Sequence, residues 1–268
     1  MNPYLEIIRP GTSFLAGLGA IAGAAISGLP FSILYLYIFL TVFLISGAGM
    51  VINDYYDIEI DRINAPQRPL PSARMSRESA ILYSLILFSS GILISTLLGI
   101  YCFLLALTNS ILEFLYSRNF KKRFLVGNVL VSYFTASTFL FGALITFDFK
   151  IIWIVCLLAF LSNMGREIYK AIEDVRGDKK MKSDTLPIAA GVKSAREIAQ
   201  GFIASAIVLS PLPYLSGLLG SLYLKIVSVS NVLFLYSFSQ HPRKIKLITK
   251  LAMFIVLLAC LLGLKFRY

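Results

Sequence analysis

The feature that most constrains the fold of this chain is a series of nine apolar stretches spread along its whole length. Each is close to the roughly 17–25 residues that a helix needs to cross a bilayer. The stretches run approximately over residues 12–29, 31–52, 79–99, 100–115, 127–146, 151–172, 198–215, 218–238 and 247–264. They lack the period-two alternation of a membrane barrel strand, so helices are the expected spans.

The composition supports a membrane protein. Hydrophobic residues make up 57% of the 268 positions, charged residues only 15%, and the mean hydropathy is +0.79. We therefore predict an all-α, polytopic membrane helix bundle with about nine transmembrane helices. It forms a single domain over residues 1–268, with two four-helix halves, roughly 1–125 and 126–240, followed by a last helix. Each half has its long polar segment after its second span.

The net charge of +11 has two interpretations. Nucleic-acid binding is one, but topology explains the charge better, because cytoplasmic loops of membrane proteins are rich in Lys and Arg. With the N-terminus inside, most of the basic residues fall in the inner segments. We expect a multi-pass cell-membrane protein with its N-terminus inside, its C-terminus outside, an active site facing the cytoplasm, membrane lipid around it and no nucleic-acid partner.

Cysteine and histidine chemistry is not expected. Cys102, Cys156 and Cys260 are isolated within apolar segments, in neither a metal-binding nor a disulfide spacing. His241 is the only histidine.

The first polar segment opens with an acidic motif that reads Asn53-Asp54-Tyr-Tyr-Asp57-Ile-Glu59-Ile-Asp61-Arg62-Ile-Asn64. At 100° per residue on a helix, Asn53, Asp54, Asp57, Asp61 and Asn64 share one face, within an arc of about 100°. Glu59 lies on the opposite face. We expect the helix to end before Pro66 and Pro69.

A second acidic motif lies around the end of the sixth stretch. Asp174 and Asp178 are one helical turn apart on one face, and Lys170 lies one turn earlier on nearly the same face. Carboxylates at this spacing repel each other. A hard cation relieves that repulsion, and these oxygen ligands suit Mg²⁺. The alternative is that both clusters are solvated loop acids balanced by neighbouring bases.

At these residues the chain resembles the UbiA superfamily of intramembrane prenyltransferases. The resemblance rests on the Asn-Asp-x-x-Asp-x-x-x-Asp run of residues 53–61, on Asn64 and Arg68-Pro69 after it, and on Asp174-x-x-x-Asp178. It covers nearly the whole chain and implies a central cavity with a polar cap, which holds two Mg²⁺ ions and a prenyl diphosphate.

The resemblance also implies roles for individual residues. The residues expected to be catalytic are Asp54, Asp57, Asp61, Asp174 and Asp178. The expected metal ligands are Asn53, Asp57, Asp61, Asp174 and Asp178. The residues expected to bind substrate are Asn53, Arg62, Asn64, Arg68, Arg118, Lys121, Lys170 and Lys182.

Within that superfamily the chain is most similar to the archaeal digeranylgeranylglyceryl phosphate synthases. The segments that carry this similarity cover residues 4–11, 53–64, 165–168, 173–178 and 185–188. It implies transfer of a geranylgeranyl group to the hydroxyl of geranylgeranylglyceryl phosphate, a lipid phosphate acceptor.

Other functions stay open at this point. An aromatic acceptor, such as a quinone or haem precursor, is the alternative within the enzyme class. A transporter would be expected to carry its ionisable groups near mid-membrane, and Lys225 is the main charged residue there. A CDP-alcohol phosphotransferase would need an Asp-Gly-x-x-Ala-Arg start, which is absent from the sequence.

Overall fold

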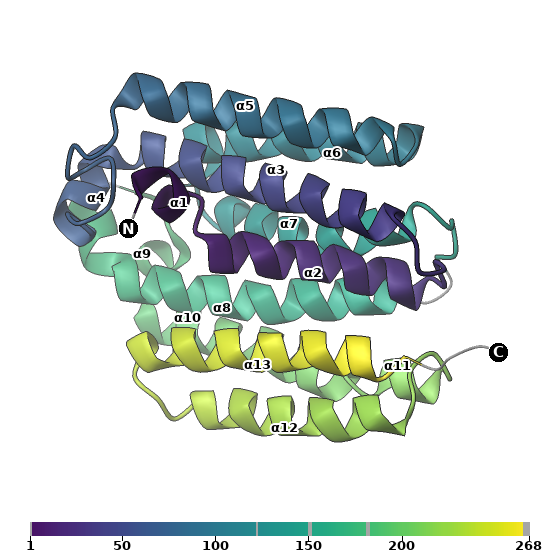
Figure 1. The fold of residues 1–268 in the computed structure, drawn as a ribbon. Coiled ribbons are helices and arrows are strands. Elements are labelled where there is room, and N and C mark those ends of the chain that lie inside the picture. Colours follow the sequence, from purple (N-terminus) through teal and green to yellow (C-terminus); the bar gives the residue numbers. More distant parts are fainter. Residues whose placement is uncertain (1, 122, 150–151, 181–182, 265–268) are drawn as a thin grey trace. The chain divides into compact units, whose positions relative to one another are not determined.

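The computed structural model describes residues 2–121, 123–149, 152–180 and 183–264, and these residues form helices joined by short turns (Figure 1). The only β pairing among them is one isolated bridge between Leu219 and Leu264. The helices are α1 (Pro3–Ile7), α2 (Pro10–Ile26), α3 (Leu34–Tyr56), α4 (Ile58–Asn64), α5 (Arg77–Thr96), α6 (Ile100–Leu115), the π-helix η1 (Tyr116–Phe120), α7 (Val126–Ala143), α8 (Ile152–Lys180), α9 (Leu186–Ala189), α10 (Val192–Leu209), α11 (Leu212–Leu215), α12 (Ser221–Ser237) and α13 (Pro242–Leu262).

The helices confirm the predicted membrane bundle. In the described residues, six helical segments are long and apolar enough to cross a bilayer, and shorter apolar helices cover Pro10–Ile26, Ser221–Ser237 and Leu247–Leu262. Every one of the predicted stretches coincides with one of these segments. The shortest predicted stretch, 100–115, continues through η1, so that the helical segment Ile100–Phe120 has 21 residues.

Two expected boundaries differ from the structure. The sixth apolar stretch is predicted to end at residue 172, but α8 continues for two further turns to Lys180. The second acidic motif therefore lies on the end of a long helix. In the other polar segment, α3 stops at Tyr56 and a separate short helix, α4, follows.

The chain divides into two compact units. Unit 1 comprises Met1–Ile21 and Phe31–Lys121, and unit 2 comprises Ala22–Pro30 and Lys122–Tyr268. The first acidic motif belongs to unit 1 and the second to unit 2.

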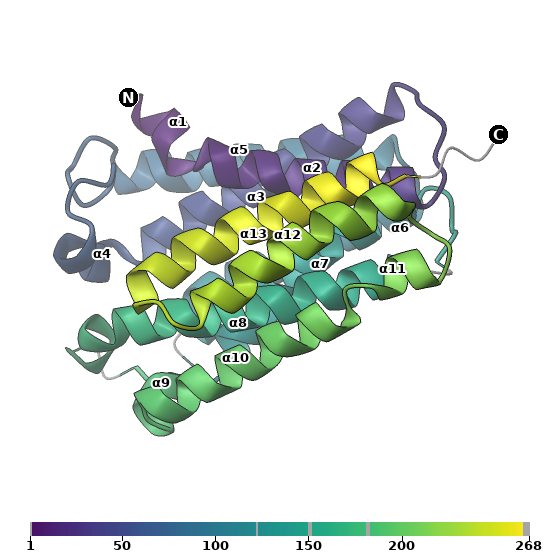
Figure 2. The same ribbon diagram turned by 90° about the horizontal axis from the view of Figure 1, so that it is seen from below.

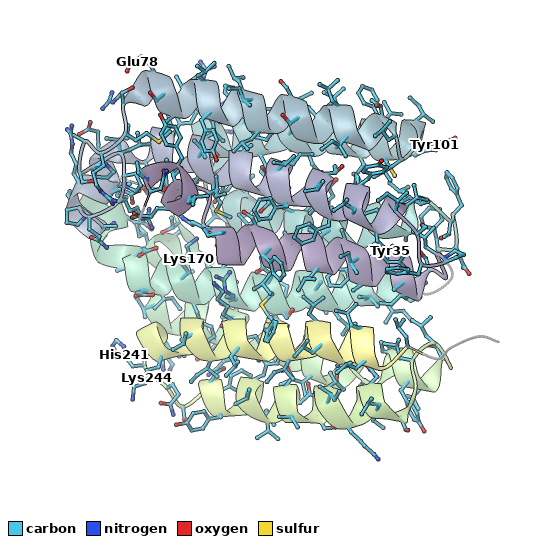
Figure 3. The ribbon with its side chains drawn as sticks, viewed as in Figure 1. Tyr35, Glu78, Tyr101, Lys170, His241 and Lys244 are labelled. Carbon is cyan, nitrogen blue, oxygen red and sulfur yellow. The ribbon has the colours of Figure 1, made fainter. Side chains whose placement is uncertain are left out.

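In unit 1, α3 lies against both α5 and α6. Figure 3 places Glu78, near the start of α5, at one end of this unit, and Tyr101, near the start of α6, at the other. Tyr35, near the start of α3, lies at the same end as Tyr101, so α3 and α6 run in the same direction. Gly99 joins α5 to α6 with a φ of +105°, a conformation that favours glycine.

In unit 2, α8 lies against α7, α10 and α13, and α12 lies along α13 (Figure 2). Gly165 lets α8 approach α10 closely, because an added Cβ would meet the Ala199 carbonyl oxygen at 2.8 Å. Small residues at helix contacts are typical of membrane bundles, in which close packing rather than hydrophobic burial holds helices together. Lys170, His241 and Lys244 lie toward one end of this unit (Figure 3).

Several hydroxyl groups inside the spans donate to the helix backbone. Ser95 donates to the Ile92 carbonyl oxygen at 2.6 Å, and Ser162 donates to that of Leu158 at 2.8 Å. Water is absent from the hydrocarbon region, so such local bonds remove the cost of placing serine there.

Candidate active site

The first acidic motif is buried. Asp54, Asp57 and Asp61 are only 2%, 4% and 5% exposed, whereas the Glu59 side chain is 60% exposed on the other side of the helix. Ordinary acidic residues of a solvated loop would be exposed to water. The burial therefore argues against the alternative that these are solvated loop acids, and it indicates that this face is a polar site.

A local break in the helix separates α3 from α4 at Asp57, where φ is −94° and ψ is 2°. Backbone hydrogen bonds continue across the break. Asp57 N donates to Asn53 O at 3.1 Å, and Asp61 N donates to Asp57 O at 2.8 Å. The acidic residues consequently keep the common face that a continuous helix predicts, although the helix itself is interrupted.

Each buried carboxylate of this motif meets a basic side chain from another segment of unit 1. Arg9, at the start of α2, pairs with Asp54. Arg68, after α4, lies 2.5 Å from Asp61 Oδ2 and 3.6 Å from Asp54 Oδ1. Lys121, after η1, pairs with Asp57 and donates to Asn53 Oδ1 at 2.9 Å.

These pairs explain how three carboxylates can be buried on one helical face. A buried charge without a partner is strongly destabilising, and a paired one is tolerated. The burial of Arg68 lowers its pKa, but the carboxylates of Asp54 and Asp61 outweigh this effect, so the net shift is upward and Arg68 stays charged. Lys121 and Arg9 keep part of their side chains exposed and can reach water.

Arg9 belongs to this site although it lies outside both acidic motifs. It has a φ of +47°, uncommon for a residue other than glycine, where α1 turns into α2. The preceding helix, α1, is held by a residue of another segment. Arg74 donates to both Glu6 carboxylate oxygens at 2.8 and 3.0 Å. These bonds hold the pKa of Glu6 below its usual value. The sequence signal for this position was the Arg9-Pro10 dipeptide, because its proline forces a turn before α2.

The remaining predicted residues of unit 1 lie outside this cluster. Arg62 is exposed and donates to Glu59 Oε2 at 2.9 Å, on the face opposite the aspartates. Asn64, the last residue of α4, and Arg118 on η1 are both exposed. The structure therefore brings Asn53, Asp54, Asp57, Asp61, Arg68 and Lys121 together and leaves Arg62, Asn64 and Arg118 at the surface.

The second acidic motif lies on the last turns of α8 in unit 2. Asp174 and Asp178 are partly buried and one turn apart, as the spacing predicts. Two turns before Asp174, Glu167 is buried and accepts hydrogen bonds from Arg166 at 2.7 Å and from Lys170 at 3.1 Å. Lys170 is thus held by Glu167, and the predicted residue Lys182 lies outside the described residues.

The donor atoms of both motifs fit a hard divalent cation. They are carboxylate and amide oxygens, and in unit 1 they are removed from water. Within the described ranges, no three acidic, cysteine or histidine side chains converge on one point. In unit 1 the carboxylates pair with Arg9, Arg68 and Lys121 instead. A bound ion would therefore displace one or more of these basic partners.

The fold and this site define a polytopic membrane protein with an aspartate-rich polar site at the end of a span. The model of the UbiA prenyltransferase family matches residues 13–263. The chain belongs to this family and is a prenyltransferase.

Its relatives are similar along the whole length. The digeranylgeranylglyceryl phosphate synthase of Methanosarcina mazei is 40% identical over an alignment of 286 residues, gaps included, which covers 98% of each sequence. A solved structure described as digeranylgeranylglyceryl phosphate synthase in membranes is 38% identical, with a TM-score of 0.79 over 97% of each chain. A UbiA homologue from Archaeoglobus fulgidus, bound to GPP and Mg²⁺, shares the fold with a TM-score of 0.71 over 97% of this chain and 98% of its own, at 19% identity.

Proposed function

We propose that this enzyme transfers a geranylgeranyl group from geranylgeranyl diphosphate to the free hydroxyl of geranylgeranylglyceryl phosphate. The product carries the second ether bond of an archaeal lipid core. The observation that carries the proposal is the buried aspartate face of unit 1 with its three basic partners. The chain that carries it is 40% identical over its length to a digeranylgeranylglyceryl phosphate synthase.

We infer that the acidic motifs serve the donor's diphosphate through bound Mg²⁺. We infer that Asn53, Asp57 and Asp61 hold one Mg²⁺ and that Asp174 and Asp178 hold a second. Bound there, Mg²⁺ supplies Lewis-acid neutralisation of the leaving diphosphate. Arg68 and Lys121 are placed to pair with diphosphate oxygens once an ion takes over their carboxylates, because guanidinium and ammonium groups bind phosphates as they bind carboxylates.

The acceptor distinguishes this reaction from those of other prenyltransferases. A lipid phosphate carries its own anion, and the sequence supplies the basic residues Arg118, Lys170 and Lys182, which suit an anionic substrate. The exposed positions of Arg62, Asn64 and Arg118 argue for contact with a polar headgroup rather than with the buried diphosphate. An aromatic acceptor such as 4-hydroxybenzoate carries one carboxylate and no phosphate, so it would need fewer basic partners.

The test is turnover by purified protein in detergent or vesicles with Mg²⁺. Radiolabelled geranylgeranyl diphosphate is offered with geranylgeranylglyceryl phosphate, 4-hydroxybenzoate or no acceptor. We expect label to enter an ether lipid with the first acceptor only. Prenylation of 4-hydroxybenzoate at an equal or higher rate would refute the ether-lipid assignment and support the aromatic one.

We propose further that both motifs face the cytoplasm, where soluble diphosphates are supplied. This follows from the excess of Lys and Arg in the segments predicted to be inside. Cysteine introduced at the exposed positions Gln67 and Ser194 is expected to resist an impermeant thiol reagent in intact cells and to react in inverted vesicles. Labelling in intact cells would reverse the orientation. The native Cys102 and Cys260 are buried, and the partly exposed Cys156 is replaced by serine in the protein used for labelling.

A further inference from the structure

A carboxyl group that the proposed metal sites do not use lies within a span of unit 1. Glu113 is on α6, and its carboxyl group rests on Gly49 of α3, where an added methyl group would overlap Glu113 Oε2. This oxygen is buried and has no hydrogen-bond partner. None of the ion pairs formed by the described residues includes Glu113. Ionisable residues inside spans are costly and usually functional.

Glu113 lies on the same helix contact as the aspartate site. Gly49, Asn53 and Asp57 follow one another at four-residue intervals along α3. Glu113, Ser117 and Lys121 have the same spacing along α6 and η1. Both ends of this register are fixed by contact, Glu113 to Gly49 at one end and Lys121 to Asp57 and Asn53 at the other. With a rise of 1.5 Å per residue, Gly49 lies about 6 Å from Asn53 and about 12 Å from Asp57 along the helix axis.

A second unpaired polar atom lies between Glu113 and Lys121. The Ser117 hydroxyl oxygen is buried and has no hydrogen-bond partner. It belongs to η1, whose wider turn is closed by the hydrogen bond from Lys121 N to Tyr116 O at 3.0 Å. Single π-helical turns are rare in proteins, and those that occur often lie at functional sites. Two unpaired buried polar groups beside such a turn indicate a place for the polar group of a ligand.

We propose that Glu113 is the general base that accepts the proton of the acceptor hydroxyl, with Ser117 as an additional hydrogen-bond partner of that hydroxyl. The inference rests on the proposed function. The diphosphate would lie at Asp57 and Lys121, and the first carbon of the prenyl chain would follow on the membrane side, toward Ser117 and Glu113. Asp54, Asp57 and Asp61 are poor candidates for this role, because basic side chains already pair with them.

The reaction then balances. The hydroxyl O–H bond breaks and the new C–O ether bond forms at the allylic carbon. The bond from that carbon to the diphosphate oxygen breaks, and diphosphate leaves with the electron pair. The proton passes to the Glu113 carboxylate, and no oxidant or reductant is required.

The competing explanation is packing, in which the Glu113 side chain only fills the space that Gly49 leaves. Glu113→Gln separates the two explanations, because glutamine keeps the size and shape of the side chain but cannot take up a proton. The matched control is Glu197→Gln, which makes the same change at an exposed glutamate on α10. Donor affinity is measured separately with the unreactive geranylgeranyl thiodiphosphate and Mg²⁺.

With geranylgeranyl diphosphate and geranylgeranylglyceryl phosphate, Glu113→Gln is expected to lower kcat by roughly 10²–10⁴-fold, the usual contribution of a general base. Donor affinity and melting temperature should stay close to those of the wild type, and Glu197→Gln should retain full turnover. Formate should restore part of the kcat of Glu113→Ala, which a packing role does not explain.

Three results would overturn the inference. The first is a kcat of Glu113→Gln within about threefold of the wild type, since general-base catalysis is worth far more than that. The second is a loss of donor affinity that matches the loss of kcat, which would assign Glu113 to the donor site or to packing. The third is a Glu113→Gln protein that unfolds while formate fails to rescue Glu113→Ala. Failure of the proposed function gives a different result, because the wild type itself would then not prenylate the lipid phosphate.

Discussion

Replacing Asp57 by alanine is expected to lower turnover by about 10²–10³-fold or more, the loss seen when one electrostatic stabiliser of a transition state is removed. Asp57 is buried at the junction of α3 and α4, and its carboxylate is the partner of Lys121. Asp174→Ala, in the second motif, is expected to cause a loss of similar size. The measurement is kcat with saturating donor and acceptor, together with the melting temperature of each purified variant.

Glu59→Ala is the matched control for Asp57→Ala. Glu59 is two residues away, is an acid and also forms ion pairs, with Arg62 and Arg77 at 2.9 and 3.0 Å. Its side chain is exposed on the opposite face, where ion pairs are worth about 0–1 kcal/mol. Turnover within about twofold of the wild type is expected, because an exposed pair contributes so little. Equal losses in Asp57→Ala and Glu59→Ala, in folded protein, would show that the aspartate face is not the reactive one.

Removing divalent cations is expected to abolish turnover altogether. The predicted ligands are hard oxygen atoms, so EDTA should stop the reaction, and excess Mg²⁺ or Mn²⁺ should restore it. The protein should remain folded in EDTA, because Arg9, Arg68 and Lys121 neutralise the buried carboxylates of unit 1 without a metal.

The control for this experiment is circular dichroism and melting of the same sample in EDTA and after Mg²⁺ is returned. Full turnover in chelator would contradict a metal-dependent mechanism at either motif. Unfolding in EDTA that Mg²⁺ reverses would show instead that the ion is needed for structure, and that the basic residues do not compensate for its loss.

The sequence alone was sufficient to predict the membrane helices and the shared face of the first motif. Apolar length decides whether a segment can cross a bilayer, and this is a local property. The position of each acid around a helix follows from its residue number, so Asp54, Asp57 and Asp61 share a face and Glu59 opposes them even though α3 breaks at Asp57. The extension of α8 to Lys180 was missed, because its last turns are polar and hydropathy does not mark them.

Only the tertiary structure decided which bases meet which acids. Lys121 pairs with Asp57 across 64 residues, and Arg9 pairs with Asp54 across 45. Arg62, adjacent to Asp61 in the sequence, instead turns outward to Glu59. The placement of Glu113 on Gly49 likewise depends on the register of α6 against α3. That register is set by close packing of the whole helix contact, a property of many side chains together that no single motif in the sequence encodes.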